Sequence, residues 1–295
     1  MAGKSIDKEN ARHEGGISHV LRRLLKEKKM AALSAVVILV MLVMALLAPL
    51  LTPYSYEEIV DPLNRLAPPS AQHLLGTDEL GRDVFTRMLY GARVSLLVGI
   101  VPTLLSMAAG AVLGILAGYL GGWVDTVIMR LADIMLAFPS MLLAMVIMYT
   151  LGDGIINIFL ALALVNWASV ARIVRAETLK LRESEYIEAS RCIGVGSLKI
   201  MWRHILPNCI PSLIVLFTLN VPSAILSESA LSFLGLGIQK PMASWGLMVN
   251  TGRQFLYNDP MLSLAPSAAI MVIVLAFNFL GDGLRDILDP HLKQR

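Results

Sequence analysis

Polar side chains inside long apolar stretches are the first residues of this sequence that could do chemistry. Asn220 and Glu228 lie in one such stretch, and Asn166 and Asn278 lie in two others. Polar groups are costly in lipid and usually face a cavity or another helix. Asn220 and Glu228 are therefore candidates to line a pathway for a polar cargo. A hydrogen bond between helices, or a contact with another subunit, explains the same residues equally well.

Catalytic and metal-binding patterns are missing from the sequence. The five histidines are scattered, none lies in an apolar stretch, and neither HExxH nor CxxC occurs. An intramembrane hydrolase would need a paired nucleophile and base, so we expect no enzyme, no catalytic residue and no metal site. The P-loop pattern GxxxxGKS/T is absent too. The chain is therefore not a P-loop ATPase, and we expect no cofactor bound to it.

The composition assigns these residues to a membrane protein. Hydrophobic residues make up 56% of the 295 residues, charged residues only 16%, and the mean hydropathy is +0.67. A typical soluble domain carries about 25% charged residues, so an ordinary soluble enzyme is excluded. The formal net charge is only +3. We expect membrane lipid, and no nucleic acid, among the partners.

Six apolar stretches predict transmembrane helices and hence an all-α integral membrane protein. The first, 31–51, carries no charge and is long enough, at about 1.5 Å per residue, to cross a hydrocarbon core of about 30 Å. The strands of a β-barrel would be near 10 residues long and would alternate, which these stretches do not. The others are approximately 94–120, 134–151, 155–171, 210–234 and 261–280.

The distribution of basic residues predicts the orientation. With six spans and both termini in the cytoplasm, the inner segments carry 19 of the 25 Lys and Arg residues, in agreement with the positive-inside rule. The chain then divides into a cytoplasmic segment 1–30, a first transmembrane helix 31–51, an external loop 52–93, a five-helix core 94–285 that includes the inner loop 172–208, and a cytoplasmic tail 286–295.

The inner loop predicts a short helix that lies outside the bilayer. Tyr186, Ala189 and Ile193 recur at i, i+3 and i+7, which puts a narrow apolar stripe on one helix face. Gly194 and Gly196 then end the helix, because glycine readily adopts the left-handed cap. A plain solvated connector fits the pattern as well.

A new helix is predicted to begin near Pro207 and Pro211, because proline is tolerated in the first turn of a helix. The short helix would then lie between two transmembrane spans.

This loop also resembles a family signature. Glu188-Ala189-Ser190, three residues, Gly194, and later Ile205-Leu206-Pro207 are similar to the EAA loop of binding-protein-dependent ABC importer permeases. Ser190 replaces the second alanine of that signature, and His204 occupies its usual isoleucine position. The resemblance implies a coupling helix that seats in a groove of a cytoplasmic ATPase. Its candidate residues are Tyr186, Glu188, Ala189, Ser190, Ile193 and Gly194.

Three further elements resemble the peptide and nickel importers of that family. They are LGTDELGRD at 75–83, LSFLGLG at 231–237, and AFNFLGDGLRD at 276–286 with Asp289-Pro290. Together the four matches cover nearly the whole chain. The sequence therefore resembles the C-type permease subunits of dipeptide, oligopeptide and nickel ABC importers, and the type I importer permease fold is implied.

The resemblance also implies partners and a cargo. A B-type permease would complete an unequal pair, two cytoplasmic ATPases would bind ATP and Mg, and an external binding protein would deliver di- or oligopeptides. The location would be a bacterial plasma (inner) membrane. Nickel or glutathione is an alternative cargo. A secondary transporter is a rival from another class, but the sequence has no convincing internal repeat.

The segment before the second span predicts an interfacial helix at the outer membrane surface. Asp78/Arg82 and Asp83/Arg87 have the i,i+4 spacing of helical ion pairs. We favour this helix over a direct contact with substrate.

A row of glycines predicts a close contact between two helices. Gly110, Gly114 and Gly118 are spaced by four residues, and small residues at this spacing let helix backbones approach.

Overall fold

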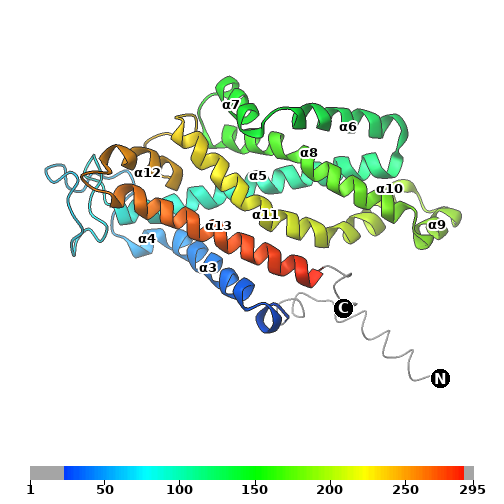
Figure 1. Cartoon of the computed structure of the whole chain (residues 1–295), viewed down its shortest axis with the longest axis horizontal. Helices are drawn as coiled ribbons and strands as arrows, with labels where there is room; N and C mark the ends of the chain where they lie inside the picture. Colours follow the sequence, from blue (N-terminus) through cyan, green and yellow to red (C-terminus); the bar gives the residue numbers. More distant parts are fainter. Residues whose placement is uncertain (1–22, 289–295) are drawn as a thin grey trace.

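The structure is a bundle of long helices that run along the length of the molecule (Figure 1). This computed structural model describes residues 23–288, and no β-strand occurs within that range. Five helices there are long and apolar enough to cross a membrane by themselves. They are α3 (Lys29–Leu46), α5 (Val84–Leu120), α8 (Ile155–Arg182), the continuous run Ser197–Phe233 and α13 (Met261–Leu288).

Shorter helices connect the long ones. They are α4 (Ala48–Leu51), α6 (Gly122–Ala137), α7 (Ser140–Leu151), α9 (Glu185–Cys192), α12 (Trp245–Gly252) and the 3₁₀ turn η2 (Arg253–Phe255). Most of the predicted terminal segments, and Asp289-Pro290, lie outside the described residues.

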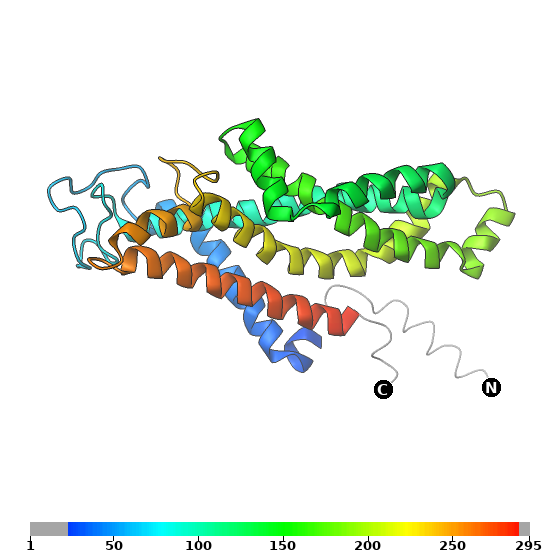
Figure 2. The ribbon, with the colours of Figure 1, turned by 45° about the horizontal axis from the view of Figure 1, so that its top comes forward.

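The predicted third span is not one continuous helix. Helices α6 and α7 meet at an angle of 95°, and Figure 2 shows α7 turned away from the axis of the bundle. The break falls at Phe138, whose backbone is extended, immediately before Pro139. Proline disfavours the helical conformation of the residue before it, so the predicted span over 134–151 is bent at this point. Helices α6 and α7 are a sixth candidate membrane span only when they are taken together as one bent span.

The short loop predicted between the third and fourth spans is confirmed. Helix α7 ends at Leu151 and α8 begins at Ile155, with Gly152 at φ +78° and Gly154 at φ +140°. Glycine adopts such angles without the steric cost that other residues incur, so three residues are enough to reverse the chain.

The close helix contact predicted for the glycine row is confirmed, and its partner is α8. A Cβ atom at Gly110 would lie 2.8 Å from the carbonyl oxygen of Trp167, and one at Gly114 would lie 2.6 Å from that of Ala171. At Gly118 it would lie 2.7 Å from Cβ of Thr178. Three successive turns of α5 therefore touch α8 where only glycine fits.

The fifth span begins earlier than predicted. Helix α10 (Ser197–Ile200), the π-turn η1 (Met201–Ile205) and α11 (Leu206–Phe233) form one helical run, so the run starts ten residues before Pro207. Pro207 has no N–H to donate and would break an α-helix. The π-turn just before it accommodates this defect, since the N–H of Leu206 donates to the carbonyl of Met201, five residues back.

The segment 77–83 is a compact turn and not the predicted interfacial helix. Asp78 Oδ1 accepts hydrogen bonds from the backbone N–H groups of Leu80 and Arg82, and α5 starts only after Asp83, whose carboxylate caps it by accepting from Thr86 N. An aspartate that bonds its own following backbone favours a turn over a helix.

One of the two predicted ion pairs in this turn exists. Arg82 Nε lies 2.7 Å from Asp78 Oδ2. Asp83 instead contacts Nδ1 of His73 at 2.9 Å, and the guanidinium of Arg87 faces Asp78 at 3.4 Å. All of these side chains are buried at the outer end of the bundle.

Helix α3 lies beside α13 in both views of the bundle (Figures 1 and 2). The ammonium of Lys28 pairs with the carboxylate of Asp286 at 2.5 Å, and a side chain at Gly283 would collide with Ala31. At its other end, α3 is held by Arg93 of α5, which donates to the carbonyls of Ala45 and Leu46.

Candidate functional site

The short helix predicted in the inner loop exists as α9 and has well-formed ends. Its backbone starts at Ser184, and Gly194 follows its last turn at φ +81°. Gly194 N donates to Arg191 O at 2.9 Å and Val195 N to Ser190 O at 3.0 Å. These two bonds form a Schellman ending, so the prediction that Gly194 ends this helix is confirmed.

One face of α9 is anchored to the bundle. Ile187 is fully buried in a cluster with residues of α5, α8 and the 197–209 segment. Arg191 lies over the ring of Tyr119 at 4.9 Å from its centroid. Our reading of the sequence missed both anchors. Ile187 is the apolar residue of this helix that does not belong to the predicted stripe.

The opposite face of α9 is exposed within the described residues 23–288. The side chains of Tyr186 and Ile193 are 45% and 80% exposed, and Glu188 and Ala189 are exposed as well. Ser190 is half-buried, and its hydroxyl donates to the carbonyl of Tyr186 at 2.7 Å. The predicted stripe therefore exists as an outward-facing apolar strip with a carboxylate beside it, which has the composition of a docking surface for another protein.

The position of α9 links it to two spans. Only Glu183 and Ser184 separate it from α8, and residues 193–196 separate it from the run that contains α11. Figure 1 shows α9 at the end of the bundle opposite the 52–83 loop. A force applied to α9 therefore acts on the ends of two long helices at once.

Helix α6 is fastened to α8 near this end. Arg175 holds Asp125 through two contacts, and Arg172 Nη2 lies 2.8 Å from Asp133. The first pair is half-buried and the second is exposed. Half of the bent third span is thus attached to the helix that leads into α9.

The two pathway candidates occupy different environments. Glu228 is fully buried, and its Oε1 accepts hydrogen bonds from Ser232 at 2.6 Å and from Ser244 at 2.9 Å. Its Oε2 has no partner among the described residues and faces Gly246. This arrangement favours the alternative, a hydrogen bond between helices. Asn220 is half-buried in α11, and its role stays a prediction.

Metal-binding and redox groups do not cluster in residues 23–288. Within them no three His, Cys, Asp or Glu side chains lie close enough to hold a metal ion. Both cysteines are free thiols, Cys192 exposed on α9 and Cys209 buried.

Sequence comparisons match this architecture to a family of transport proteins. Residues 110–294 match the family described as "Binding-protein-dependent transport system inner membrane component". Residues 18–69 match the "N-terminal TM domain of oligopeptide transport permease C".

Three relatives are similar over nearly their whole length. A dipeptide transport system permease protein of Alkalihalophilus pseudofirmus is 47% identical over 91% of this chain and 88% of its own. A glutathione transport system permease protein of Pectobacterium atrosepticum is 43% identical, over 92% and 90%. An oligopeptide transport system permease protein of Bacillus subtilis is 39% identical, over 91% and 88%.

The fold and the exposed helix between two spans define a membrane-embedded permease subunit. The family match covers more than half of the chain, and the chain belongs to the binding-protein-dependent transport system inner membrane components. It is the permease of an ABC importer and not itself an enzyme. Such a permease works with a further permease, an ATPase and a binding protein.

Proposed function

We propose that this chain is the C-type permease of an ATP-driven peptide importer and that α9 is its coupling helix. The observation that carries the proposal is the geometry of α9. Ile187 anchors the helix to the bundle, while Tyr186, Ala189 and Ile193 face outward. A helix that served only as a connector would have no reason to expose an apolar strip at the end of the molecule.

The cargo that we propose is a di- or oligopeptide delivered by an external binding protein. Relatives named for dipeptide and oligopeptide transport support it. A relative named for glutathione transport is consistent with the same chemistry, because glutathione is itself a small peptide. Nickel is a different chemical class, and competition by peptides in an uptake assay separates it from the proposed cargo.

The remaining assembly follows from the same role. A B-type permease pairs with this chain, and two ATPases that bind ATP and Mg sit against the coupling helices. Both termini and α9 face the cytoplasm of a bacterial cell. The excess of basic residues on the proposed inner segments supports this orientation.

The mechanism that we propose is mechanical. ATP binding closes the two ATPases, which displaces α9 together with the adjoining ends of α8 and α11. The ion pair of Arg175 with Asp125 carries α6 along with α8. The result is a population shift between inward-facing and outward-facing packings, driven by the difference in ATPase affinity for the two. No covalent step takes place in this chain.

The coupling role is tested on α9 itself. Glu188→Arg inverts the charge beside the outward strip, and Gly194→Pro cannot adopt the φ of +81°. We expect both variants to insert into the membrane but to lose peptide uptake and ATPase binding. Glu183→Arg, an exposed glutamate just outside α9, is the matched control and should retain both. Normal uptake by both α9 variants would rule out the coupling role.

The orientation is tested with the native cysteines. In membranes stripped of ATPases, a membrane-impermeant maleimide should label the exposed Cys192 only from the cytoplasmic side. Cys209 is buried and should stay unlabelled, and Cys192→Ser supplies the background. Labelling from the external side would overturn the proposed topology.

A further inference from the structure

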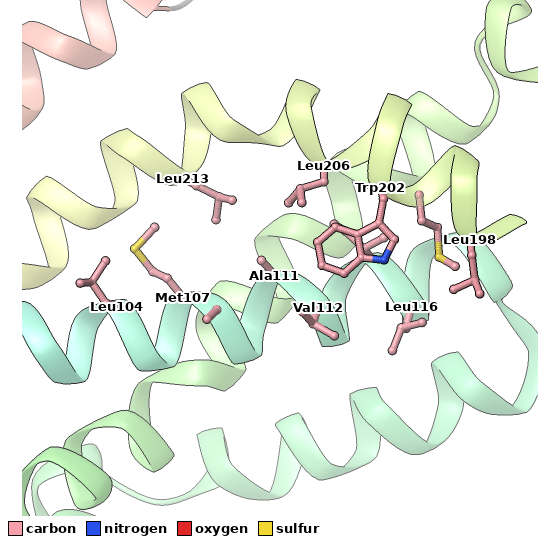
Figure 3. A pocket seen from close by; sticks show the side chains of 12 residues that line it. Leu104, Met107, Ala111, Val112, Leu116, Leu198, Trp202, Leu206 and Leu213 are labelled. Atoms are coloured by element: carbon pink, nitrogen blue, oxygen red, sulfur yellow. The ribbon is translucent and has the colours of Figure 1, made fainter. Parts of the chain in front are cut away.

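A long apolar groove runs between α5 and the helical run that follows α9. Its volume is about 370 Å³, and every residue that lines it is apolar. Leu104, Val112 and Leu116 line one wall, and Leu198, Trp202 and Leu213 line the other (Figure 3). Neither α9 nor the loop at the outer end contributes a residue to its lining, so the groove is separate from the coupling surface.

The length of the groove matches one leaflet of a bilayer. Its wall on α5 extends from Leu104 to Leu116, which at the rise of an α-helix is about 18 Å. Half of a hydrocarbon core is about 15 Å.

The end of the groove near α9 carries the features of a membrane–water boundary. Leu198 and Trp202 are 68% and 60% exposed there. Tryptophan concentrates at membrane interfaces, where its ring sits at the level of the headgroups. The π-turn Met201–Ile205 forms this part of the wall, and π-turns within helices occur frequently at functional sites.

Two basic residues lie on the helical run that forms this end of the wall. Lys199 and Arg203 follow Leu198 and Trp202 by one position each and are exposed. Neither side chain forms an ion pair or hydrogen bond with any other residue in the 23–288 range. Long basic side chains can extend along apolar surface while their charged ends reach a phosphate. The groove thus offers an apolar binding surface, and two long basic side chains on the same helical run are available to reach toward a headgroup at its end.

We propose that this groove binds an anionic phospholipid of the cytoplasmic leaflet. One acyl chain lies between α5 and α11, and Lys199 and Arg203 contact the phosphate and the anionic headgroup. The leaflet assignment rests on the proposed orientation of α9. The lipid supports the start of the α11 run where the π-turn interrupts its α-helical hydrogen bonding, directly after the coupling helix.

The test is lipid retention by the whole importer complex, purified from bilayers that contain equal phosphatidylglycerol and phosphatidylcholine. Native mass spectrometry should find phosphatidylglycerol bound in preference. Each basic residue near the surface contributes roughly 1 kcal/mol toward anionic lipid, so Lys199→Ala/Arg203→Ala should lower this preference by up to about 30-fold. Arg130→Ala/Lys180→Ala removes two exposed charges away from the groove and should leave it unchanged.

A photoreactive residue at position 112 identifies the occupant directly. Val112 is 45% exposed on the groove wall, and benzoylphenylalanine there should form an adduct with phospholipid in the assembled complex. An adduct with the partner permease, or equal lipid preference in all variants, overturns the proposal. If Cys192 is labelled from outside, the topology fails. If Cys192 is labelled only from the cytoplasmic side but the unmodified complex shows no preference for phosphatidylglycerol, the groove proposal alone fails.

Discussion

The guanidinium of Arg175 in α8 holds the carboxylate of Asp125 in α6 by two parallel contacts, Nε–Oδ1 at 2.5 Å and Nη2–Oδ2 at 2.6 Å. Such paired contacts fix geometry as well as charge. Asp125 also lies in the first turn of its helix, where the helix dipole favours a negative charge. The pair therefore fastens half of the bent third span to the helix that leads into α9.

Breaking that pair should disconnect α6 from the movement of α8. We expect Asp125→Ala to lower the free energy of unfolding by about 1 to 3 kcal/mol, because it leaves a half-buried guanidinium without its partner. Peptide uptake should fall, while ATPase binding persists. Thermal unfolding of the complex and an uptake assay measure the two effects.

A charge exchange and a second ion pair serve as controls. Asp125→Arg/Arg175→Asp should recover part of the uptake. Asp133→Ala removes an exposed pair with Arg172, which is worth at most about 1 kcal/mol. If Asp125→Ala transports normally, the pair has no part in transmission.

The two faces of α9 should respond differently to truncation. Ile187→Ala removes a fully buried side chain and should cost about 2 to 5 kcal/mol of stability. Tyr186→Ala, on the exposed face, should leave the unfolding temperature unchanged but weaken ATPase binding. Unfolding by heat and pull-down of the ATPase separate these results. Equal loss of stability in both variants would contradict the division into an anchored face and a docking face.

The glycine row should tolerate no side chain. Gly114→Ala places a Cβ 2.6 Å from a backbone oxygen of α8, and overpacking of this kind costs about 1 to 3 kcal/mol. Gly196→Ala is the matched control, since a Cβ there meets nothing within 4 Å and its φ is −63°. We expect a lowered unfolding temperature for Gly114→Ala alone. Identical melting of the two variants would show that the helices are not packed this closely.

Substitutions at Glu228 should affect stability, whereas substitution of Asn220 should affect transport. Glu228→Gln keeps an oxygen that can accept from Ser232 and Ser244, so it should melt close to the native protein, whereas Glu228→Ala should lose about 1 to 3 kcal/mol. Asn220→Leu should lower transport while assembly and ATPase stimulation persist. Unchanged uptake by Asn220→Leu would remove this residue from the pathway.

Much of the fold could be predicted because hydropathy and length alone identify helices that cross lipid. The close helix contact at the glycine row followed from the spacing of small residues, although the sequence did not identify α8 as the partner helix. Pro139 marks a place where a helix can kink, but a bend of 95° was not predicted. An uninterrupted apolar stretch looks the same whether the helix is straight or broken.

The misreading of the outer turn and the failure to identify the partners of Glu228 have a common cause. Spacing along the chain cannot distinguish a helix from a compact turn, since Asp78 and Arg82 pair in both. In the same way, Ser244, which satisfies Glu228, lies 16 residues further along the chain on another element. Burial and long-range partners decide such cases, and a single sequence contains neither. On α9, the exposed stripe was predictable, but the anchor Ile187 was not.

The link between α8 and α9 consists of only Glu183 and Ser184. A joint of two residues has little slack, so it cannot absorb a displacement by uncoiling. Under the proposed coupling role, the displacement of α9 by the ATPase would therefore pass to α8 almost undiminished. Inserting a few flexible residues there should give a complex that still hydrolyses ATP but transports little peptide.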